Sequence, residues 1–306
     1  MLEQRGRNDV DMKKEYVFAA YTIFCWGTLP VVTKLTLTSI SNMQVLFISS
    51  LIASVCLWLY LFLCGKWQMV RLLKYSDLWQ LTALGLLGNF LYSAFYYASL
   101  RTLPSADACI INYLWPIIAT ICAAVVLHEK ICNFEWLAIL FSFAGVIIIS
   151  VKDNKMGIAN LQGVLLCVAG AFCYGIFNVL NKKKGLDQLF CTAIYFAVTT
   201  VCSGMALLVT KDISPMSGRT WGGILWLGVV IDALAIVTWG MALQGTDVGF
   251  LSNFAYLTPV VAAILSFFIL HEQIGVYVIL GMAFILGGCF LQIYNRKRLM
   301  DQKIDS

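Results

Sequence analysis

The chain has 306 residues, of which 60% are hydrophobic and only 12% are charged, and its net charge is +5. A soluble domain carries roughly 25% charged residues, so this composition excludes an ordinary soluble enzyme or binding domain. A bilayer core of about 30 Å requires roughly 20 consecutive apolar residues, and the chain contains such runs repeatedly. The sequence therefore predicts a membrane protein that crosses the lipid bilayer several times. Its basic excess needs no nucleic-acid partner.

The chain begins with the charged segment MLEQRGRNDVDMKKE, and the apolar run behind it is too long for the hydrophobic region of a signal peptide. We therefore expect residues 1–14 to form a tail and the first helix to remain in the protein. Only helices and closed barrels satisfy backbone groups in lipid, and no run alternates like a strand, so we expect an all-α membrane protein. Ten spans are predicted, at 15–36, 43–64, 77–99, 105–127, 133–151, 160–181, 188–209, 220–242, 248–270 and 275–294.

The distribution of lysine and arginine in the short loops predicts the orientation, because these residues are enriched on the cytoplasmic side. With a cytoplasmic N-terminus, most of the 21 basic residues fall on the inner side, including the tail at 295–306. Both termini are therefore expected in the cytoplasm, in a bacterial-type inner (plasma) membrane. The basic residues left on the outer side are Lys34, Arg101, Lys152, Lys155, Lys211 and Arg219.

The fourth and ninth predicted helices carry nearly the same pattern. YLWPIIATICAAVVLHE begins at Tyr113, and YLTPVVAAILSFFILHE begins 143 residues later at Tyr256. In the first and sixth helices, FCWG from Phe24 matches FCYG from Phe172. Each copy holds five helices, an odd number, so the second copy crosses the membrane in the opposite sense. Such inverted repeats, here 15–151 and 160–294, are typical of secondary transporters.

These residues resemble the EamA-type drug/metabolite transporters over essentially the whole chain, and within that superfamily they are most similar to the aromatic amino acid exporters of the YddG type. The resemblance implies ten helices in two inverted halves, and a central cavity lined by aromatic side chains at the positions of Tyr113 and Trp115. The segments that carry it are Asn112–Pro116, Gly170–Lys182, Trp239, and Tyr256 with Thr258 and Pro259.

Pro116 and Pro259 lie in otherwise apolar helices and are expected to kink them, since proline removes a backbone hydrogen bond and frees a carbonyl. Asn112, Tyr113 and Trp115 stand in front of the first kink. Trp115 lies about ten residues into its helix, which is too deep for an interfacial aromatic belt. We therefore expect these three side chains to line a cavity and stack against a flat or apolar substrate.

Further aromatic candidates lie at mid-helix positions of both copies. Tyr92 and Tyr96 are spaced i, i+4 and so share one face of the third helix, either as packing or as part of the pocket. Trp26 and Tyr174 are related by the repeat, and each is followed by a glycine that lets helices approach closely. Trp239 and Tyr256 are the comparable candidates of the second half.

Two carboxylates lie inside the predicted spans. A carboxylate in the membrane is costly and commonly marks a pathway or a proton site. Asp232 lies near the middle of its helix, at the repeat position equivalent to Asn89. It either carries a coupling proton or forms a structural hydrogen bond to a neighbouring helix. Asp107, one turn inside its helix, is a candidate for the outer gate, where the resemblance places an acidic residue. Glu272, at a helix end, is expected to act as a cap.

The combined features predict a secondary transporter that exports small metabolites, with aromatic amino acids first, by alternating access. No GxxxxGK[ST] motif is present, so ATP hydrolysis and other cofactors are not expected, and neither is a metal site, because His128 and His271 fall on opposite sides. Purines, nucleosides and drug-like compounds remain alternative substrates. An intramembrane enzyme or a channel fits less well. The expected partners are a small molecule and the bilayer, and a monomer is compatible with the sequence.

Overall fold

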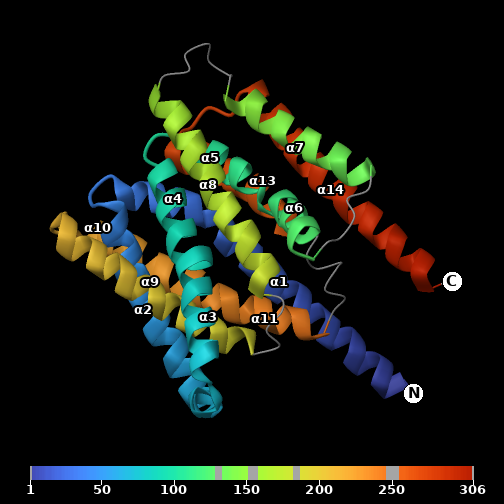
Figure 1. Cartoon of the computed structure of the whole chain (residues 1–306), viewed down its shortest axis with the longest axis horizontal. Coiled ribbons are helices and arrows are strands. Elements are labelled where there is room, and N and C mark those ends of the chain that lie inside the picture. Colours follow the sequence, from blue (N-terminus) through green and yellow to red (C-terminus); the bar gives the residue numbers. More distant parts are fainter. Residues whose placement is uncertain (1, 128–132, 151–157, 182–186, 246–254, 305–306) are drawn as a thin grey trace. The chain divides into compact units, whose positions relative to one another are not determined.

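The computed structural model of the chain describes residues 2–127, 133–150, 158–181, 187–245 and 255–304. Every regular element in these ranges is a helix (Figure 1). The elements are α1 (Leu2–Leu37), α2 (Asn42–Leu63), η1 (Lys66–Leu72), α3 (Tyr75–Gly85), η2 (Leu86–Leu91), α4 (Tyr92–Ser99), α5 (Ser105–Asn112), α6 (Trp115–Leu127), α7 (Asn133–Ser150), α8 (Ile158–Asn181), α9 (Gln188–Thr210), α10 (Gly218–Leu225), η3 (Trp226–Leu234), α11 (Ala235–Gly245), η4 (Ala255–Leu257), α13 (Thr258–Leu270) and α14 (Val276–Ile304).

The predicted all-helical membrane protein is confirmed. Within the described ranges, six helical stretches have the length and hydropathy to cross a bilayer, and three shorter apolar helices accompany them. The six are Tyr16–Leu37, Asn42–Leu63, Ser105–Val125, Asn160–Asn181, Gln188–Thr210 and Gly218–Ala242. The shorter ones are Trp136–Ile149, Ala255–Leu270 and Val276–Leu291. The exact number of ten crossings stays a prediction.

The helices pack as two compact units, and each unit draws on both halves of the sequence. The first unit combines Met1–Phe90 with Leu186–Leu270, and the second combines Leu91–Gly185 with His271–Ser306. The helical rod that begins with α3 passes from one unit into the other between Phe90 and Leu91, inside the π-helical segment η2.

In the first unit, α2 packs along α9, and the two helices begin in the same way. The side chain of Ser41 caps α2 by accepting a hydrogen bond from the Gln44 N–H, and Asp187 caps α9 through Phe190. The two caps lie 146 residues apart, in keeping with the repeat. A hydrogen bond of 2.6 Å from Lys66 Nζ to Asp187 Oδ2 ties the end of α2 to the start of α9.

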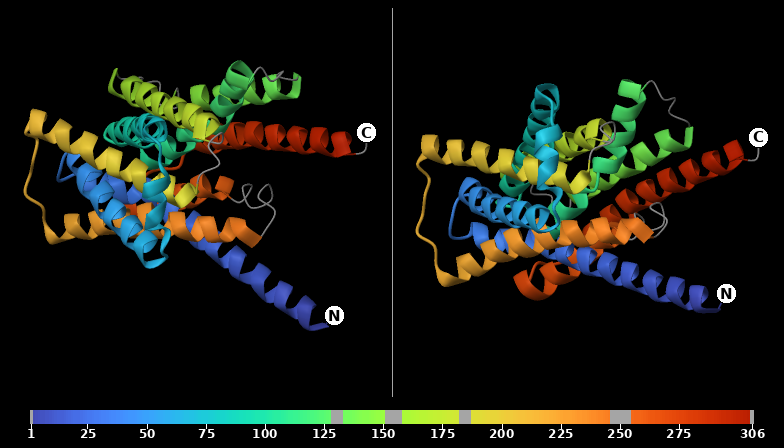
Figure 2. Two further views of the ribbon diagram at one scale, coloured as in Figure 1. Left: turned by 60° about the horizontal axis from the view of Figure 1, so that its bottom comes forward. Right: turned by 90° about the horizontal axis from the view of Figure 1, so that it is seen from below.

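The charges of this pair are mutually stabilised outside the membrane spans. The hydrogen bond to Asp187 raises the pKa of Lys66. Burial by itself would raise the pKa of Asp187, but the bonds from Lys66 and from the Phe190 N–H outweigh that effect and hold this pKa below its usual range. At the opposite end of the pair, the Ser41 hydroxyl donates to the Asp212 carbonyl, in the extended connection between α9 and α10 that Figure 2 shows in gold.

Helix α1 is the centre of the remaining part of the first unit and packs on α10, η3, α11 and α13. Two polar contacts along its length set its register against the α10–η3–α11 rod. The Trp226 Nε1–H donates to the Thr28 hydroxyl at 2.8 Å, and the Thr22 hydroxyl donates to the Ala235 carbonyl at 3.2 Å. Threonine hydroxyls therefore link helices that are more than 190 residues apart in sequence.

In the second unit, α7 lies along α14 (Figure 1). Two repeat-related glycines allow this close contact. A Cβ at Gly145 would lie 2.7 Å from the Gly281 carbonyl oxygen, and one at Gly288 would lie 2.6 Å from that of Ala138. Gly288 corresponds to Gly145 in the repeat, and Gly281 corresponds to Ala138, both at an offset of 143 residues. The two helices therefore make equivalent contacts with each other. The other part of this unit is built around α8, which packs on α4, α5 and α6.

Candidate functional site

The first candidate segment is a broken helix. Helix α5 ends at Asn112 and α6 begins at Trp115, with a turn at Tyr113 and Leu114 between them. The backbone N–H groups of both turn residues bond to carbonyls only three positions back, which tightens the chain before it restarts. Pro116 thus lies in the first turn of α6, where its missing N–H costs little, and not inside a kinked continuous helix as expected.

A proline has the same position in a helix of the first unit. Pro259 is the second residue of α13, behind the 3₁₀ turn η4 that carries Tyr256 half-buried. Both prolines therefore lie in the first turn of a helix, at the positions where the sequence predicted kinks. The Cys289 thiol of α14 donates to the Tyr113 carbonyl, in the turn before Pro116, at 3.7 Å. Tyr113 itself is almost fully buried.

Four predicted site residues of the second unit form an aromatic cluster, which we define as Tyr92, Tyr96, Trp115 and Tyr174. Tyr174 of α8 is its centre. The Tyr92 ring of α4 stacks on it with centroids 4.7 Å apart, and the Trp115 ring of α6 meets it edge-on at 5.2 Å. Tyr92 also stacks on Tyr96 at 6.0 Å, as their i, i+4 spacing suggested. Three helices thus contribute rings to one group.

A polar group lies beside the aromatic cluster. The Asn112 side chain donates through Nδ2 to the Tyr92 hydroxyl at 3.1 Å. Its carbonyl oxygen Oδ1 is buried and has no hydrogen-bond partner among the described residues. Buried polar atoms are nearly always hydrogen-bonded, so an acceptor left open beside stacked rings calls for an explanation, and a bound donor would supply one.

The first unit contains the repeat counterpart of this cluster. The rings of Trp26 in α1 and Trp239 in α11 lie 5.2 Å apart at an interplanar angle of 50°. Trp26 corresponds to Tyr174 and Trp239 to Tyr96, so the equivalent pairs of helices meet through aromatic rings in both units. Where the second unit has Trp115, the first unit has Thr258, whose hydroxyl is buried and has no partner within the described ranges.

Glycines next to the central rings follow the same symmetry. A Cβ at Gly27, after Trp26, would lie 2.5 Å from a methyl carbon of Val261. A Cβ at Gly175, after Tyr174, would lie 2.8 Å from a methyl carbon of Ile118, the counterpart of Val261. Each glycine therefore allows a close helix contact: Gly27 lets α1 approach α13, and Gly175 lets α8 approach α6.

The sequence did not single out one residue pair that distinguishes the copies. Pro30 lies inside α1, four residues after Trp26, so the Trp26 carbonyl cannot receive the usual i→i−4 backbone bond. At the matching place in α8, the Asn178 side chain donates to the Tyr174 carbonyl at 2.7 Å. In the sequence, this difference between the copies is visible as a proline four residues after Trp26 and an asparagine four residues after Tyr174.

The two predicted carboxylates lie in different environments. Asp107 is buried in the first turn of α5, and the cap of that helix is supplied by Glu272, as expected for this residue. The Glu272 carboxylate accepts hydrogen bonds from the N–H and hydroxyl of Ser105, all at 2.9 Å. Asp232 is half-buried within η3. His128, considered together with His271 for a metal site, lies outside the described residues.

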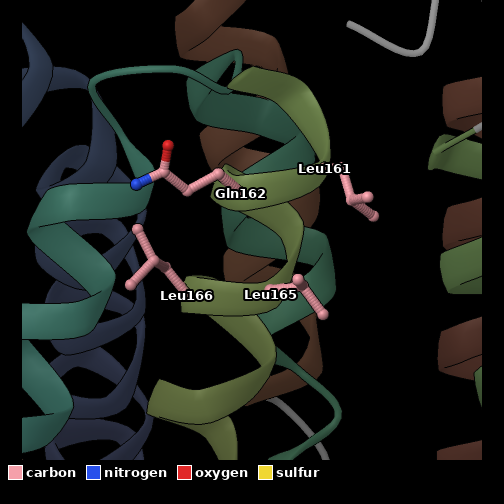
Figure 3. A pocket seen from close by; sticks show the side chains of 4 residues that line it. All are labelled: Leu161, Gln162, Leu165 and Leu166. Carbon is pink, nitrogen blue, oxygen red and sulfur yellow. The ribbon is translucent and has the colours of Figure 1, made fainter. Parts of the chain in front are cut away.

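A surface pocket of about 320 Å³ lies on α8, and its lining includes no residue of the aromatic cluster. Its lining is apolar apart from Gln162, which projects on the same side of α8 as Leu166, while Leu161 and Leu165 project on the other (Figure 3). None of the predicted site residues lines it. Exposed leucines on a bilayer-spanning helix are typical of a lipid-facing surface.

A sequence model of the EamA-like transporter family matches the chain twice, at residues 13–151 and 161–294. The chain belongs to this family. Its members are transporters and not enzymes, so the protein is a multi-pass membrane protein that acts as a secondary transporter of small metabolites. The two matches occupy the two halves in which the sequence repeats.

Relatives found by sequence agree with this EamA family membership. An uncharacterized transporter of Clostridium kluyveri is 25% identical over 95% of this chain and 97% of its own. The aromatic amino acid exporter YddG of Ancylobacter novellus is 25% identical over 61% of this chain and 66% of its own. The S-adenosylmethionine uptake transporter of Rickettsia prowazekii is 24% identical over 92% of this chain and 96% of its own.

A protein of known crystal structure shares the fold, with a TM-score of 0.64 at 20% identity over 94% of this chain and 99% of that chain. The named relatives differ in what they carry and in the direction in which they carry it. Family membership therefore establishes the class of transporter, and the substrate has to be inferred from the residues of the site.

Proposed function

We propose that this EamA-family protein exports amino acids with aromatic side chains by alternating access around a cavity lined by aromatic residues. The main observation that supports this proposal is the cluster of Tyr92, Tyr96, Trp115 and Tyr174. Beside it lies Asn112, whose buried Oδ1 has no hydrogen-bond partner among the described residues. Aromatic faces favour a flat apolar ring, which they bind by offset or edge-on stacking. An amide oxygen favours an N–H donor such as an ammonium group. An aromatic amino acid has both.

The topology that this function needs is part of the proposal. Ten crossings in two inverted five-helix repeats, at 15–151 and 160–294, would leave the tails 1–14 and 295–306 in the cytoplasm of a bacterial-type inner membrane. The paired prolines near the starts of α6 and α13 and the paired glycine contacts support two structurally equivalent copies. Trp26, Trp239, Tyr256 and Tyr113 are proposed as further substrate-binding residues, and Asp107 is proposed to act at the outer gate.

S-Adenosylmethionine is the second candidate substrate, since one relative is named for its uptake. It also combines a flat ring with an α-amino acid group, so the same site chemistry fits it. Purines and drug-like compounds lack the amino acid group that the Asn112 acceptor favours, although their rings would stack equally well.

The direct test is counterflow in liposomes that contain the purified protein, with labelled tryptophan, phenylalanine, tyrosine, leucine and S-adenosylmethionine compared in parallel. We expect exchange of the three aromatic amino acids and weak exchange of leucine. Exchange of S-adenosylmethionine without that of any aromatic amino acid would replace the proposed substrate by the second candidate.

Trp115→Ala tests the site itself. Loss of its edge-on contact with Tyr174, and of the surface it offers a substrate, is expected to lower kcat/KM for tryptophan about tenfold, because an aromatic pair is worth about 0.5–1.5 kcal/mol beyond its burial. The matched control is Trp136→Ala, which removes an exposed tryptophan of α7 in the same unit. Equal transport by the two variants would remove Trp115 from the site.

A further inference from the structure

Two π-helical segments lie at the same position of the two copies. They are η2 (Leu86–Leu91) and η3 (Trp226–Leu234), and both follow or include a glycine that contacts a neighbouring helix. A Cβ at Gly85 would lie 3.1 Å from the Tyr195 Cα of α9, and one at Gly228 would lie 2.7 Å from the Ser49 carbonyl oxygen of α2. A π-helical turn is rare and is often found at functional sites.

Each π-helical segment carries one amide or carboxyl side chain in the same register, Asn89 in η2 and Asp232 in η3, 143 residues apart. Asn89 is satisfied, because its Nδ2 donates to the Thr199 hydroxyl of α9 at 2.9 Å. The helix caps and glycine contacts align α9 with α2 at an offset of 146, which places Ala53 where Thr199 stands. Ala53 is fully buried and has no group to offer a carboxyl.

Asp232 therefore differs from its counterpart in two respects at once. The asparagine is replaced by an ionisable residue, and the hydroxyl that bonds the asparagine is replaced by a methyl group. Within the part of the chain that the structure describes, no hydrogen bond or ion pair reaches the Asp232 carboxyl. A carboxylate kept only for structure would be expected to have such a partner.

Among the side chains that the structure describes, the elements packed on η3 offer no opposite charge at the level of Asp232. They are α1, α2, α10 and α11, and their described charged side chains are Lys34 and Arg219, both toward the end of the helix pair where Thr36 contacts Gly223. Asp232 lies between the Thr28–Trp226 and Thr22–Ala235 contacts. The remaining titratable side chains in these elements are tyrosines and cysteines, namely Tyr16, Tyr21 and Cys25 in α1 and Cys56 and Tyr60 in α2.

We propose that Asp232 binds and releases one proton in each transport cycle, and so couples substrate movement to the proton gradient. The carboxylate takes a proton from water on one side of the membrane and becomes a neutral carboxylic acid. It returns the proton to water on the other side, and the gradient supplies the proton. Asp232 precedes Trp239 by seven residues of the same rod, roughly 10 Å at 1.5 Å per residue, so one helix carries both the proton site and a proposed substrate contact.

This inference rests on the proposed transport function, and the experiment separates the two. Liposomes with the purified protein are assayed for tryptophan counterflow without a gradient, and then for tryptophan accumulation driven by an imposed pH gradient. Trapped pyranine reports proton movement. We expect Asp232→Asn to retain counterflow while gradient-driven accumulation and the pyranine signal fall to the level of protein-free liposomes.

Asn89→Ala is the matched control, since it removes the polar side chain of the other π-helical segment, and it should keep accumulation coupled to the gradient. Asp232→Glu keeps a carboxyl and should keep coupling. If Asp232→Asn loses counterflow as well, the glutamate variant decides: retained coupling supports the proton site, and loss of both activities contradicts it.

Two further outcomes overturn the inference. One is accumulation by the unmodified protein that does not depend on the pH gradient, and the other is coupled accumulation by Asp232→Asn. Absence of counterflow in the unmodified protein, for every compound of the panel, would overturn the proposed function and the inference together.

Discussion

Tyr174 and Asn112 have different roles in substrate recognition at the proposed site. Tyr174 holds the rings of Tyr92 and Trp115 in place from a third helix, so its contribution is one of shape. Asn112 contributes direction, because its Nδ2 is engaged by the Tyr92 hydroxyl and this bond orients Oδ1. A substrate donor that reaches Oδ1 would satisfy a buried acceptor, which otherwise costs about 1–3 kcal/mol.

Tyr92→Phe tests this orientation. The variant keeps the stacked ring and removes only the hydroxyl that accepts from Asn112, so about 1 kcal/mol of hydrogen bonding is lost. We expect an increase of about fivefold in KM for tryptophan with little change in kcat, measured by initial rates of uptake. Tyr75→Phe, which alters an exposed tyrosine at the start of α3, serves as control. An unchanged KM would show that Asn112 does not depend on this bond.

At the residue scale, the sequence selected aromatic side chains that make ring contacts in the structure, but it did not predict how they meet. Mid-helix depth and the repeat selected Trp26, Trp115 and Tyr174, and the i, i+4 spacing selected Tyr92. The stacking of Tyr92 on Tyr174 depends on how α4 packs against α8, and periodicity in one helix contains no information on its neighbour. Pro30 was missed for a related reason, since its effect is visible only beside Asn178 in the other copy.

At the scale of elements, the pairing of α7 with α14 depends on glycine. Gly288→Ala is expected to lower the free energy of unfolding by about 1–3 kcal/mol, because the added Cβ would lie 2.6 Å from the Ala138 carbonyl oxygen and the helices must separate. Thermal unfolding in detergent measures it. Gly287→Ala is the matched control, as a Cβ there meets nothing within 4 Å. Similar melting temperatures for the two variants would argue against close packing at Gly288.

The α2–α9 pair offers a test that depends on pH. Asp187→Ala removes both the cap of α9 and the ion pair with Lys66, and should lower the free energy of unfolding by about 1 kcal/mol. Asp187→Asn keeps a capping side chain and should cost less, since exposed ion pairs contribute about 0–1 kcal/mol. Thermal unfolding of the two variants and the unmodified protein provides the comparison.

The sign of the pH effect follows from the two shifts. Because the pKa of Asp187 is lowered in the folded protein, its charge stabilises the fold above the unfolded-state pKa, and this stabilisation is lost as the pH falls through the folded-state pKa. Because the pKa of Lys66 is raised, its contribution is present below the unfolded-state pKa and is lost as the pH rises through the folded-state pKa. The difference between the unmodified protein and Asp187→Asn should therefore vanish in acid. A difference that persists there would exclude the ion pair as its cause.

The broken helices show where sequence reasoning about elements reaches its limit. A proline in an apolar run is compatible with a kink or with a break, and the sequence around Pro116 does not distinguish them. The break is made before the proline, by Tyr113 and Leu114, whose N–H groups bond to carbonyls three residues back. The thiol of Cys289 on α14 then donates to the Tyr113 carbonyl, and that contact is tertiary.

At the scale of the whole molecule, the predicted halves and the packed units are different divisions of the same chain. The repeat was read from spacings of 143 and 148 residues, and the family matches coincide with it. The compact units each mix helices from both halves. Sequence periodicity identifies which segments are equivalent, whereas packing decides which segments touch, so only the first could be predicted.

The proposed topology has a direct test in bacteria. Alkaline phosphatase is active only outside the cytoplasm, and green fluorescent protein folds well inside it. We expect fluorescence from a fusion after residue 306, phosphatase activity from a fusion in the 211–217 connection between α9 and α10, and no phosphatase activity from a fusion after Lys66. Phosphatase activity at the C-terminus would contradict an even number of crossings with a cytoplasmic N-terminus.

The pairing of helices across the repeat has one more consequence. The principal contacts join the two halves: α1 with α11 and α13, α2 with α9, α7 with α14, and α8 with α4 and α6. One half on its own would expose to lipid the glycine and threonine faces that fit the other half. The protein is thus comparable to a dimer whose subunits happen to share one chain, and each half completes the fold of its twin.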